Sequence, residues 1–267
     1  ISLIMAAVLL LSACVQDPFE EYENFVNDLD ISARIEDAVS GVGQGNTSSF
    51  FIDEVKTLYD DLGTFDQKDD KAHEINQFYS NCVNDLLYRQ RGGQLPIEVP
   101  LILSNHETMR DLADFYGVPF EHLAIASADD KAAFESRVLE VVEQQHIELV
   151  VLARYMQILA PELCEALAGK AINIHHSFLP GFKGANPYRQ AHGRGVKLIG
   201  ATAHFVTTDL DEGPIIEQDV VRVDHSYTPT QLMQLGQDEE ARVLRRAVGW
   251  YAENRVLLDG DRTIIFK

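Results

Sequence analysis

The feature that most constrains the fold is a regular alternation of short apolar runs and helical stretches between residues 99 and 174. The apolar runs are residues 99–103 (VPLIL), 122–126, 148–153 (ELVVLA) and 171–174. Runs of this length predict buried strands. One intervening stretch has Pro161 in its first turn and Gly169 after its end, as helices do. Strands that alternate with helices at this spacing predict a parallel sheet with helices on both faces.

Beyond residue 174 the pattern changes. Residues 199–206 alternate in polarity, as a half-buried strand does, and residues 214–223 form a further strand. The remaining expected elements are helices at residues 85–91, 107–116, 132–145, 161–167 and 230–254, and a short strand at 262–266. We therefore expect an α/β, Rossmann-like fold with a mostly parallel sheet. Sites in such folds form beyond the carboxyl ends of the strands.

The charge distribution separates the first part of the chain from the rest. The formal net charge is −20, which disfavours nucleic acid and anionic membranes as partners because both require a basic patch. Residues 1–76 hold 16 of the 42 acidic residues but only 4 of the 22 basic ones. We therefore expect an atypical, unassigned acidic segment at residues 15–76 and a catalytic domain at residues 77–267.

The chain begins with an almost wholly apolar run, and Leu11 to Cys14 (LSAC) resembles a lipoprotein cleavage box. That pattern would make residues 1–14 a signal-like segment of an exported lipoprotein with a lipidated Cys14. No Lys or Arg precedes the run, although signal peptides need a positive start. The three cysteines form no C-x-x-C pair, which is typical of reduced thiols in the cytoplasm. We expect a cytoplasmic protein whose apolar run is a buried strand or helix, with export as the alternative.

The residues best suited to chemistry lie at one strand end and in one acidic loop. Asn173 and His175 are two apart at the end of a predicted strand, so both side chains point the same way. Asp211 lies in the loop Asp-Leu-Asp-Glu-Gly, where Gly213 allows the backbone to approach a ligand. Asn and His can stabilise an oxyanion, while Asp can set the protonation of His and accept a proton from a nucleophile. This combination predicts acyl transfer to water.

The sequence around these residues resembles the formyltetrahydrofolate deformylases, which belong to the formyltransferase-like superfamily. The resemblance lies in residues 173–188 (NIHHSFLPGFKGANPY) and 200–225 (GATAHFVTTDLDEGPIIEQDVVRVDH), and it extends over about residues 82–267. It implies a formyltransferase fold, with the family's Asn-x-His strand end and Asp loop at Asn173, His175 and Asp211.

The resemblance also implies a reaction and a substrate site. The reaction is hydrolysis of 10-formyltetrahydrofolate to formate and tetrahydrofolate, which supplies purine synthesis and balances one-carbon pools. Residues 152–161 (LARYMQILAP) resemble the loop that holds the pterin ring, largely through backbone groups. The implied substrate-binding residues are Arg154, Tyr155, Met156, Gln157, Ile158, Leu159, His176 and Gly213. The resemblance further implies a folate as the small-molecule partner, a homo-oligomer, no metal and no tightly bound cofactor.

Two features depart from the family pattern. Residues 1–76 lack the strand and helix rhythm of the regulatory ACT domain that normally opens such chains. The family also places an apolar strand just before the helix that begins near Cys82, whereas residues 74–81 are polar here. Either another segment, such as residues 1–11, fills this central position, or the domain is incomplete.

Three rival functions remain open. A formyltransferase with an amine acceptor would need a phosphate-binding glycine loop after its first strand, and none is recognisable in the sequence. A metal hydrolase could use His175, His176, His204 and Asp211, although His204 lies on an alternating strand and is expected to be a packed histidine. A non-catalytic exported lipoprotein or an inactive homologue is the third.

Overall fold

The computed structural model describes residues 5–11, 82–153, 155, 157–177 and 187–266. The chain divides into two compact units, Ile1–Cys14 with Asn76–Lys267, and Val15–Ile75. All described residues belong to the first unit. Cys14 and the predicted segment 15–76 lie outside the described residues.

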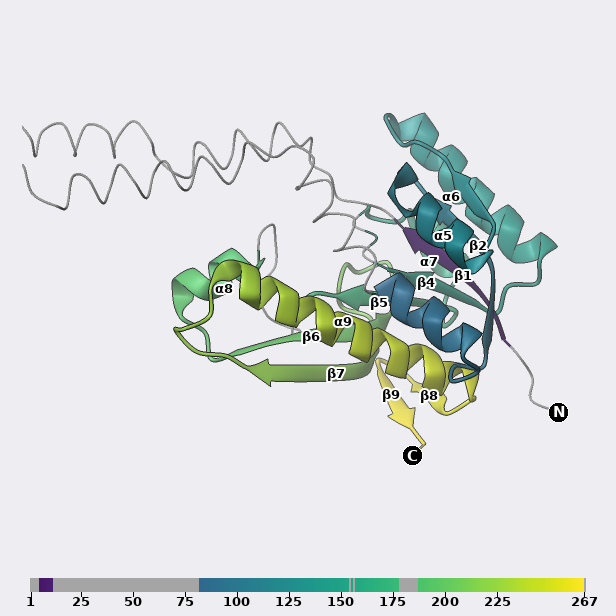
Figure 1. Ribbon diagram of the computed structural model, residues 1–267. Helices are drawn as coiled ribbons and strands as arrows, with labels where there is room; N and C mark the ends of the chain where they lie inside the picture. The colour runs from purple at the N-terminus through teal and green to yellow at the C-terminus, as the bar shows by residue number, and fades with distance from the viewer. Residues whose placement is uncertain (1–4, 12–81, 154, 156, 178–186, 267) are drawn as a thin grey trace, which may run out of the picture. The chain divides into compact units, whose positions relative to one another are not determined.

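A seven-stranded sheet forms the centre of this unit, in the order β3-β2-β1-β4-β5-β6-β7 (Figure 1). Its strands are β1 (Met5–Leu11), β2 (Ile97–Ser104), β3 (Phe120–His122), β4 (Leu149–Leu152), β5 (Ala171–His175), β6 (Leu198–Phe205) and β7 (Ile215–Arg222). The neighbouring strands β3, β2, β1, β4 and β5 are parallel to one another. Strand β6 pairs antiparallel with β5, and β7 pairs antiparallel with β6. The predicted α/β fold with a mostly parallel sheet is confirmed.

Strand β1 lies in the middle of the sheet, between β2 and β4. A central parallel strand is covered on both faces and therefore needs a continuous apolar sequence. The run MAAVLLL meets this need, and Met5 and Ala7 are buried. Of the two alternatives that the sequence left open, the structure has the first, in which residues from the beginning of the chain fill the central position. The segment that we set apart as signal-like thus contributes a strand to the same unit as residues 76–267.

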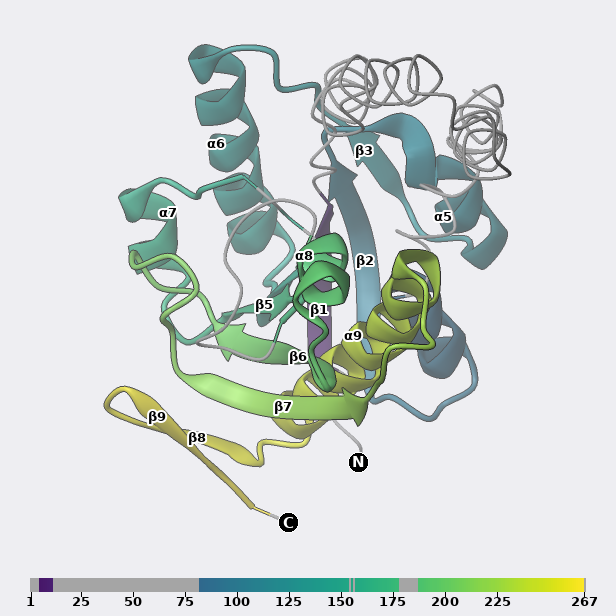
Figure 2. The same cartoon turned by 90° about the vertical axis from the view of Figure 1, so that its left-hand side faces the viewer.

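Helices cover both faces of the sheet, as predicted. They are a helix over residues 82–91, then η1 (Glu107–Met109), α5 (Arg110–Tyr116), α6 (Ala128–Gln144), α7 (Pro161–Ala166), α8 (Pro187–Arg194) and α9 (Pro229–Ala252). Figure 2 shows α6 and α7 on one face and α5 and α9 on the other. The pleat of β4 divides its side chains between the two cores: Leu149 and Val151 join the α9 side, and Val150 and Leu152 join the α6 side.

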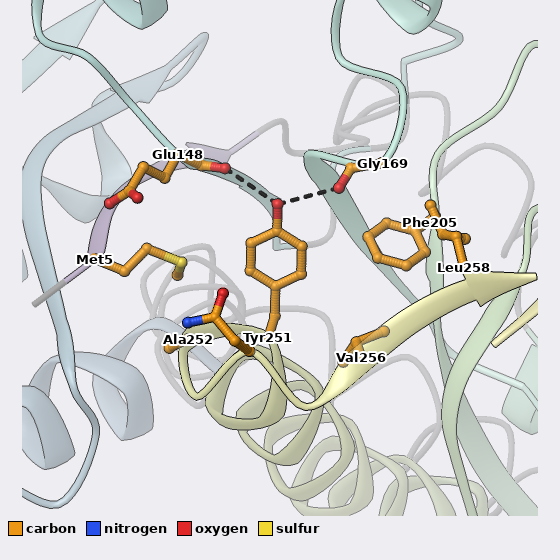
Figure 3. Close-up of a pocket in the computed structure, with 9 residues that line it drawn as sticks. Met5, Glu148, Gly169, Phe205, Tyr251, Ala252, Val256 and Leu258 are labelled. Atoms are coloured by element: carbon orange, nitrogen blue, oxygen red, sulfur yellow. Dashed lines mark hydrogen bonds between the residues drawn. The ribbon is translucent and has the colours of Figure 1, made fainter. Parts of the chain in front are cut away.

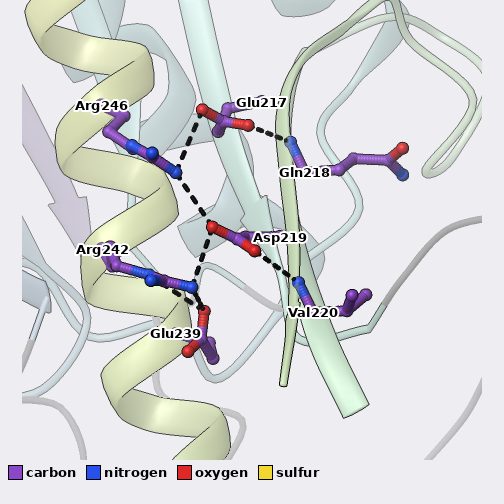
Figure 4. Close-up of polar contacts among 7 residues, drawn as sticks. All are labelled: Glu217, Gln218, Asp219, Val220, Glu239, Arg242 and Arg246. Atoms are coloured by element: carbon purple, nitrogen blue, oxygen red, sulfur yellow. Dashed lines mark hydrogen bonds and ion pairs between the residues drawn. The ribbon is translucent and has the colours of Figure 1, made fainter. Parts of the chain in front are cut away.

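Helix α9 is the longest described helix and packs along β6 and β7. Thr228 forms a capping box with Gln231 at its start. Ion pairs link its exposed side to β7: Asp219 accepts from both Arg242 (2.8 Å) and Arg246 (2.9 Å) (Figure 4). Exposed pairs of this kind contribute about 0–1 kcal/mol each. Burial of its apolar face therefore does most to hold α9 on the sheet.

Several predicted boundaries are wrong. Helix α6 begins at Ala128 rather than at residue 132, because the Ser127 side chain caps it by accepting from the Asp130 N–H. Strand β3 is Phe120–His122 rather than 122–126. Strand β2 ends at Ser104, whose carbonyl accepts from the Leu123 N–H, so the chain beyond has no strand to pair with.

Helix α8 and strand β8 (Val256–Asp259) were not predicted from the sequence. Helix α8 begins at the last two residues of the motif 173–188 and runs on to Arg194. The chain ends in a hairpin of β8 and β9 (Arg262–Ile265), of which only β9 was expected. Gly260 has φ 63° in the hairpin turn, a conformation that glycine adopts without strain.

Candidate active site

The candidate site lies at the carboxyl ends of β4 and β5. Asn173 and His175 come from the last three residues of β5, and Asp211 comes from the loop between β6 and β7. Asp211 has φ 59°, a left-handed conformation that Asp and Asn tolerate better than most residues. This backbone turn helps direct the carboxylate back toward β5.

His175 and Asp211 form an ion pair or charge-assisted hydrogen bond. The distance from His175 Nδ1 to Asp211 Oδ1 is 3.2 Å. Burial of the Asp211 carboxyl would raise its pKa, but hydrogen bonds and charges from the nearby His175 and His204 rings outweigh burial and hold the pKa well below its usual value. The carboxylate is therefore ionised, and Nδ1 of His175 carries the proton that it accepts. The opposite ring atom, His175 Nε2, is buried and has no hydrogen-bond partner among the described residues.

His204 joins the same cluster, although the sequence analysis grouped it with His175 and Asp211 only in the metal-hydrolase alternative and otherwise expected a packed histidine. Its Nδ1 donates to the Phe205 carbonyl at 2.9 Å, because a carbonyl can only accept. Its Nε2 lies 3.2 Å from Asn173 Nδ2 and 3.7 Å from Asp211 Oδ1. The contact with the His204 ring fixes the orientation of the Asn173 amide. The prediction of a packed histidine is right about burial, since His204 is 3% exposed, but it missed these contacts.

The predicted ring-binding segment lines a cavity next to this cluster. The part of this segment that lines the cavity is Tyr155, Gln157, Ile158 and Leu159, between β4 and α7. The cavity is also lined by Asn173, His204 and Asp211. Residues 207–210 of the β6–β7 loop complete the described wall. The structure therefore brings the predicted ring-binding segment to the same cavity as Asn173 and Asp211, while His175 reaches this site through its contact with Asp211. Arg154 and Met156 lie outside the described residues, as do residues 178–186 of the motif.

His176 and Gly213 have different surroundings from those expected of ligand contacts. His176 is buried, and its ring stacks on that of His175 with centroids 4.8 Å apart. A Cβ on Gly213 would lie 1.8 Å from the Phe205 carbonyl oxygen. The close approach that requires glycine is therefore to the backbone of β6, and it holds the Asp211 loop against that strand.

A second cavity, of about 320 Å³, lies at the opposite ends of the strands from the candidate site (Figure 3). It is lined by Met5 at the start of β1, by Glu148 and Gly169 just before β4 and β5, and by the end of α9. The Tyr251 hydroxyl lies 3.1 Å from the Gly169 carbonyl and 3.3 Å from that of Glu148. This cavity is at the amino ends of the strands, away from the candidate site.

None of the described helices is long and apolar enough to cross a membrane. No group of three or more described His, Cys, Asp or Glu residues is arranged to hold a metal ion.

Comparisons with known proteins identify the family. The formyl transferase family model matches residues 78–248. A formyltetrahydrofolate deformylase from Corynebacterium sp. (strain P-1) is 53% identical over 189 residues, which cover 71% of this chain and 66% of the relative. The relative from Bacillus subtilis is 48% identical, and 62% of it is covered. The chain thus spans less than two thirds of the length of these curated relatives.

Solved structures agree. The formyltetrahydrofolate deformylase from Burkholderia mallei has a TM-score of 0.68 and 58% identity, covering 70% of this chain and 66% of that one. The matched part of the chain contains the strand end and loop that carry Asn173, His175 and Asp211. The resemblance seen in the sequence is confirmed, and the chain belongs to the formyl transferase family.

Proposed function

We propose that this chain hydrolyses 10-formyltetrahydrofolate to formate and tetrahydrofolate, with Asn173, His175 and Asp211 as its catalytic residues. The observation that carries the proposal is the Nδ1–Oδ1 contact between His175 and Asp211 beside the cavity lined by the β4–α7 segment. The names of the relatives that resemble the chain at about 50% identity support the substrate and reaction.

In the proposed mechanism a water molecule attacks the formyl carbon. Asp211 is ionised, so a carboxylate oxygen can accept the water proton, directly or through solvent; its low pKa keeps it ionised but also makes it a weak base. Asp211 holds Nδ1–H of His175, so the buried Nε2 is the ring atom left for the developing oxyanion, and it must carry a second proton to donate to it. One N–H of the Asn173 amide goes to His204, and the other remains for the same oxyanion. Collapse of the tetrahedral intermediate breaks the C–N bond, and N10 leaves with a proton.

The proposed substrate site is the β4–α7 segment. Its backbone groups would hold the pterin ring, with Tyr155, Gln157, Ile158 and Leu159 lining the cavity. The proposal keeps four further predicted substrate-binding residues, which are Arg154, Met156, His176 and Gly213. For Gly213 the contribution would be indirect, through the position of the Asp211 loop.

The decisive experiment incubates the purified protein with 10-formyltetrahydrofolate and no amine, and measures formate and tetrahydrofolate. We expect both products in equal amounts, with His175→Asn reducing their rate by at least about 100-fold. His146→Asn is a matched control, because His146 is exposed and its φ of 53° suits asparagine. Absence of formate without an amine would contradict the hydrolase proposal.

A folate-dependent formyltransferase is the second candidate. A glycinamide ribonucleotide transformylase from Symbiobacterium toebii is 32% identical, with a TM-score of 0.65, and 90% of it is covered. Formate release only after addition of an amine, with a formylated amine as product, would favour this candidate. The third possibility, an inactive homologue, predicts neither product.

Three further expectations belong to the proposal. Activity should persist in the presence of chelators, since we propose no metal and no tightly bound cofactor. The three sparse cysteines form no C-x-x-C pair, which supports a cytoplasmic location, and an unmodified Cys14 in the intact protein would agree with it. Light scattering after size-exclusion chromatography should reveal a homo-oligomer.

A further inference from the structure

Helix α6 buries a carboxylate next to the β4–α7 segment. Glu135 is 7% exposed, and its described neighbours on the inner face of α6 are Phe134, Val138 and Val141. A buried carboxylate is costly unless hydrogen bonds and an opposite charge compensate it. Both are present: Oε1 lies 3.0 Å from the Ala160 N–H and 3.6 Å from Lys131 Nζ.

The hydrogen bond to Ala160 crosses 25 residues of sequence and reaches the end of the proposed ring-binding segment. Ala160 is the N-cap residue of α7, with φ −64° and ψ 146°. Its N–H therefore lies outside the hydrogen-bond ladder of α7. Glu135 satisfies this N–H and fixes the backbone directly after Leu159, a residue that lines the cavity.

The beginning of the segment, at Tyr155, packs against Phe134, the residue next to Glu135 on α6. The ring of Tyr155 packs on that of Phe134, with centroids 6.0 Å apart and planes inclined by 30°. The pKa of Tyr155 is raised, first by burial and then by the negative charge of Glu135. Two adjacent residues of α6 thus hold both ends of the segment.

We infer that Glu135 is a positioning residue that sets the backbone of residues 157–159 for the folate ring, an inference that rests on the proposed function. A buried ion pair contributes little net stability, because desolvation offsets its attraction. What Glu135 provides is a directional acceptor for one backbone N–H. The catalytic side chains lie on β5 and the β6–β7 loop, so displacement of the segment should weaken substrate binding more than it slows the chemical step.

The test compares variants that remove the acceptor with variants that keep it. Glu135→Leu removes it with an apolar side chain of similar size, and Glu135→Gln keeps an amide oxygen at the same place. We expect Glu135→Leu to raise KM for 10-formyltetrahydrofolate about tenfold with kcat within about twofold, and Glu135→Gln to restore KM to within about threefold. Lys131→Met is the control, because it removes the ion pair but leaves the hydrogen bond.

A second variant removes the donor instead. Ala160→Pro deletes the N–H, and the φ and ψ of Ala160 suit proline before Pro161. It should raise KM as Glu135→Leu does. The KM of the double variant should be no higher than that of either single variant. Equal KM values for wild type, Glu135→Leu and Ala160→Pro, or a fall in thermal stability alone, would refute the positioning role.

Hydrogen–deuterium exchange separates this inference from the proposed function. Peptides that cover residues 155–160 should exchange faster in Glu135→Leu than in wild type, whether or not formate is produced. Unchanged exchange would refute the inference even in an active enzyme. No formate from the wild type would refute the hydrolase proposal, and the exchange result would still decide whether Glu135 holds the segment.

Discussion

Replacement of Asp211 by asparagine tests the core of the candidate site. The change removes one charge while keeping the shape of the side chain, and asparagine tolerates the left-handed φ of 59° at this position. Asp211→Asn should therefore leave the backbone of the β6–β7 loop in place. It removes the carboxylate that accepts from His175 Nδ1 at 3.2 Å.

The expected loss follows from two effects. A hydrogen bond to a charged group contributes about 1.5–3 kcal/mol, so loss of His175 orientation alone should lower kcat about 10- to 150-fold. Loss of proton acceptance from water should cost at least about another 100-fold. We expect kcat to fall about 10³-fold or more, while the KM for the folate stays within about threefold because the β4–α7 segment is unchanged.

Steady-state formate release and equilibrium binding of tetrahydrofolate would measure the two quantities. Asp238→Asn is the matched control, since Asp238 is an exposed carboxylate on α9. A kcat within about tenfold of wild type would refute the proposed function of Asp211. A large loss of folate affinity with little change in kcat would place Asp211 in binding instead.

The same variant should change the pH dependence of stability. The pKa of Asp211 is lower in the folded protein than in the unfolded chain, so its ionised form stabilises the fold above the unfolded pKa of about 4. That contribution is lost as the pH falls through the lower, folded-state pKa. Denaturant titrations should therefore find wild type more stable than Asp211→Asn near pH 6, with a difference that shrinks as the pH falls below about 4. A pH-independent difference would contradict the assigned direction.

Three other substitutions test the surrounding structure. Gly213→Ala should destabilise the protein by at least about 1–3 kcal/mol in urea titrations, because the new Cβ would lie 1.8 Å from the Phe205 carbonyl oxygen; a neutral effect would contradict this packing. His204→Phe should lower kcat about tenfold by releasing the Asn173 amide, with circular dichroism to confirm folding, and an unchanged kcat would mean that the 3.2 Å contact is unimportant for turnover. Ala7→Asp should prevent folding, because Ala7 is fully buried in the central strand, and a normally folded variant in the same spectra would argue against that position of β1.

The sequence by itself determined the parallel part of the sheet apart from β1, and one half of the site. Apolar runs separated by helical stretches leave few arrangements other than an α/β sheet, because both faces of each strand must be covered. Asn173 and His175 could be placed together from local geometry alone, since residues two apart on a strand share a face. The family was also recognisable from the residues around them.

The tertiary structure decided what depends on contacts between distant segments. An apolar composition allowed Met5–Leu11 to be a strand, but only its pairing with β2 and β4 placed it in the centre of the sheet. His204 entered the site because the antiparallel register sets it opposite Asn173, and register follows from packing rather than from local pattern. The hydrogen bond from Ala160 to Glu135 likewise joins residues 25 positions apart, and no local preference specifies such a contact.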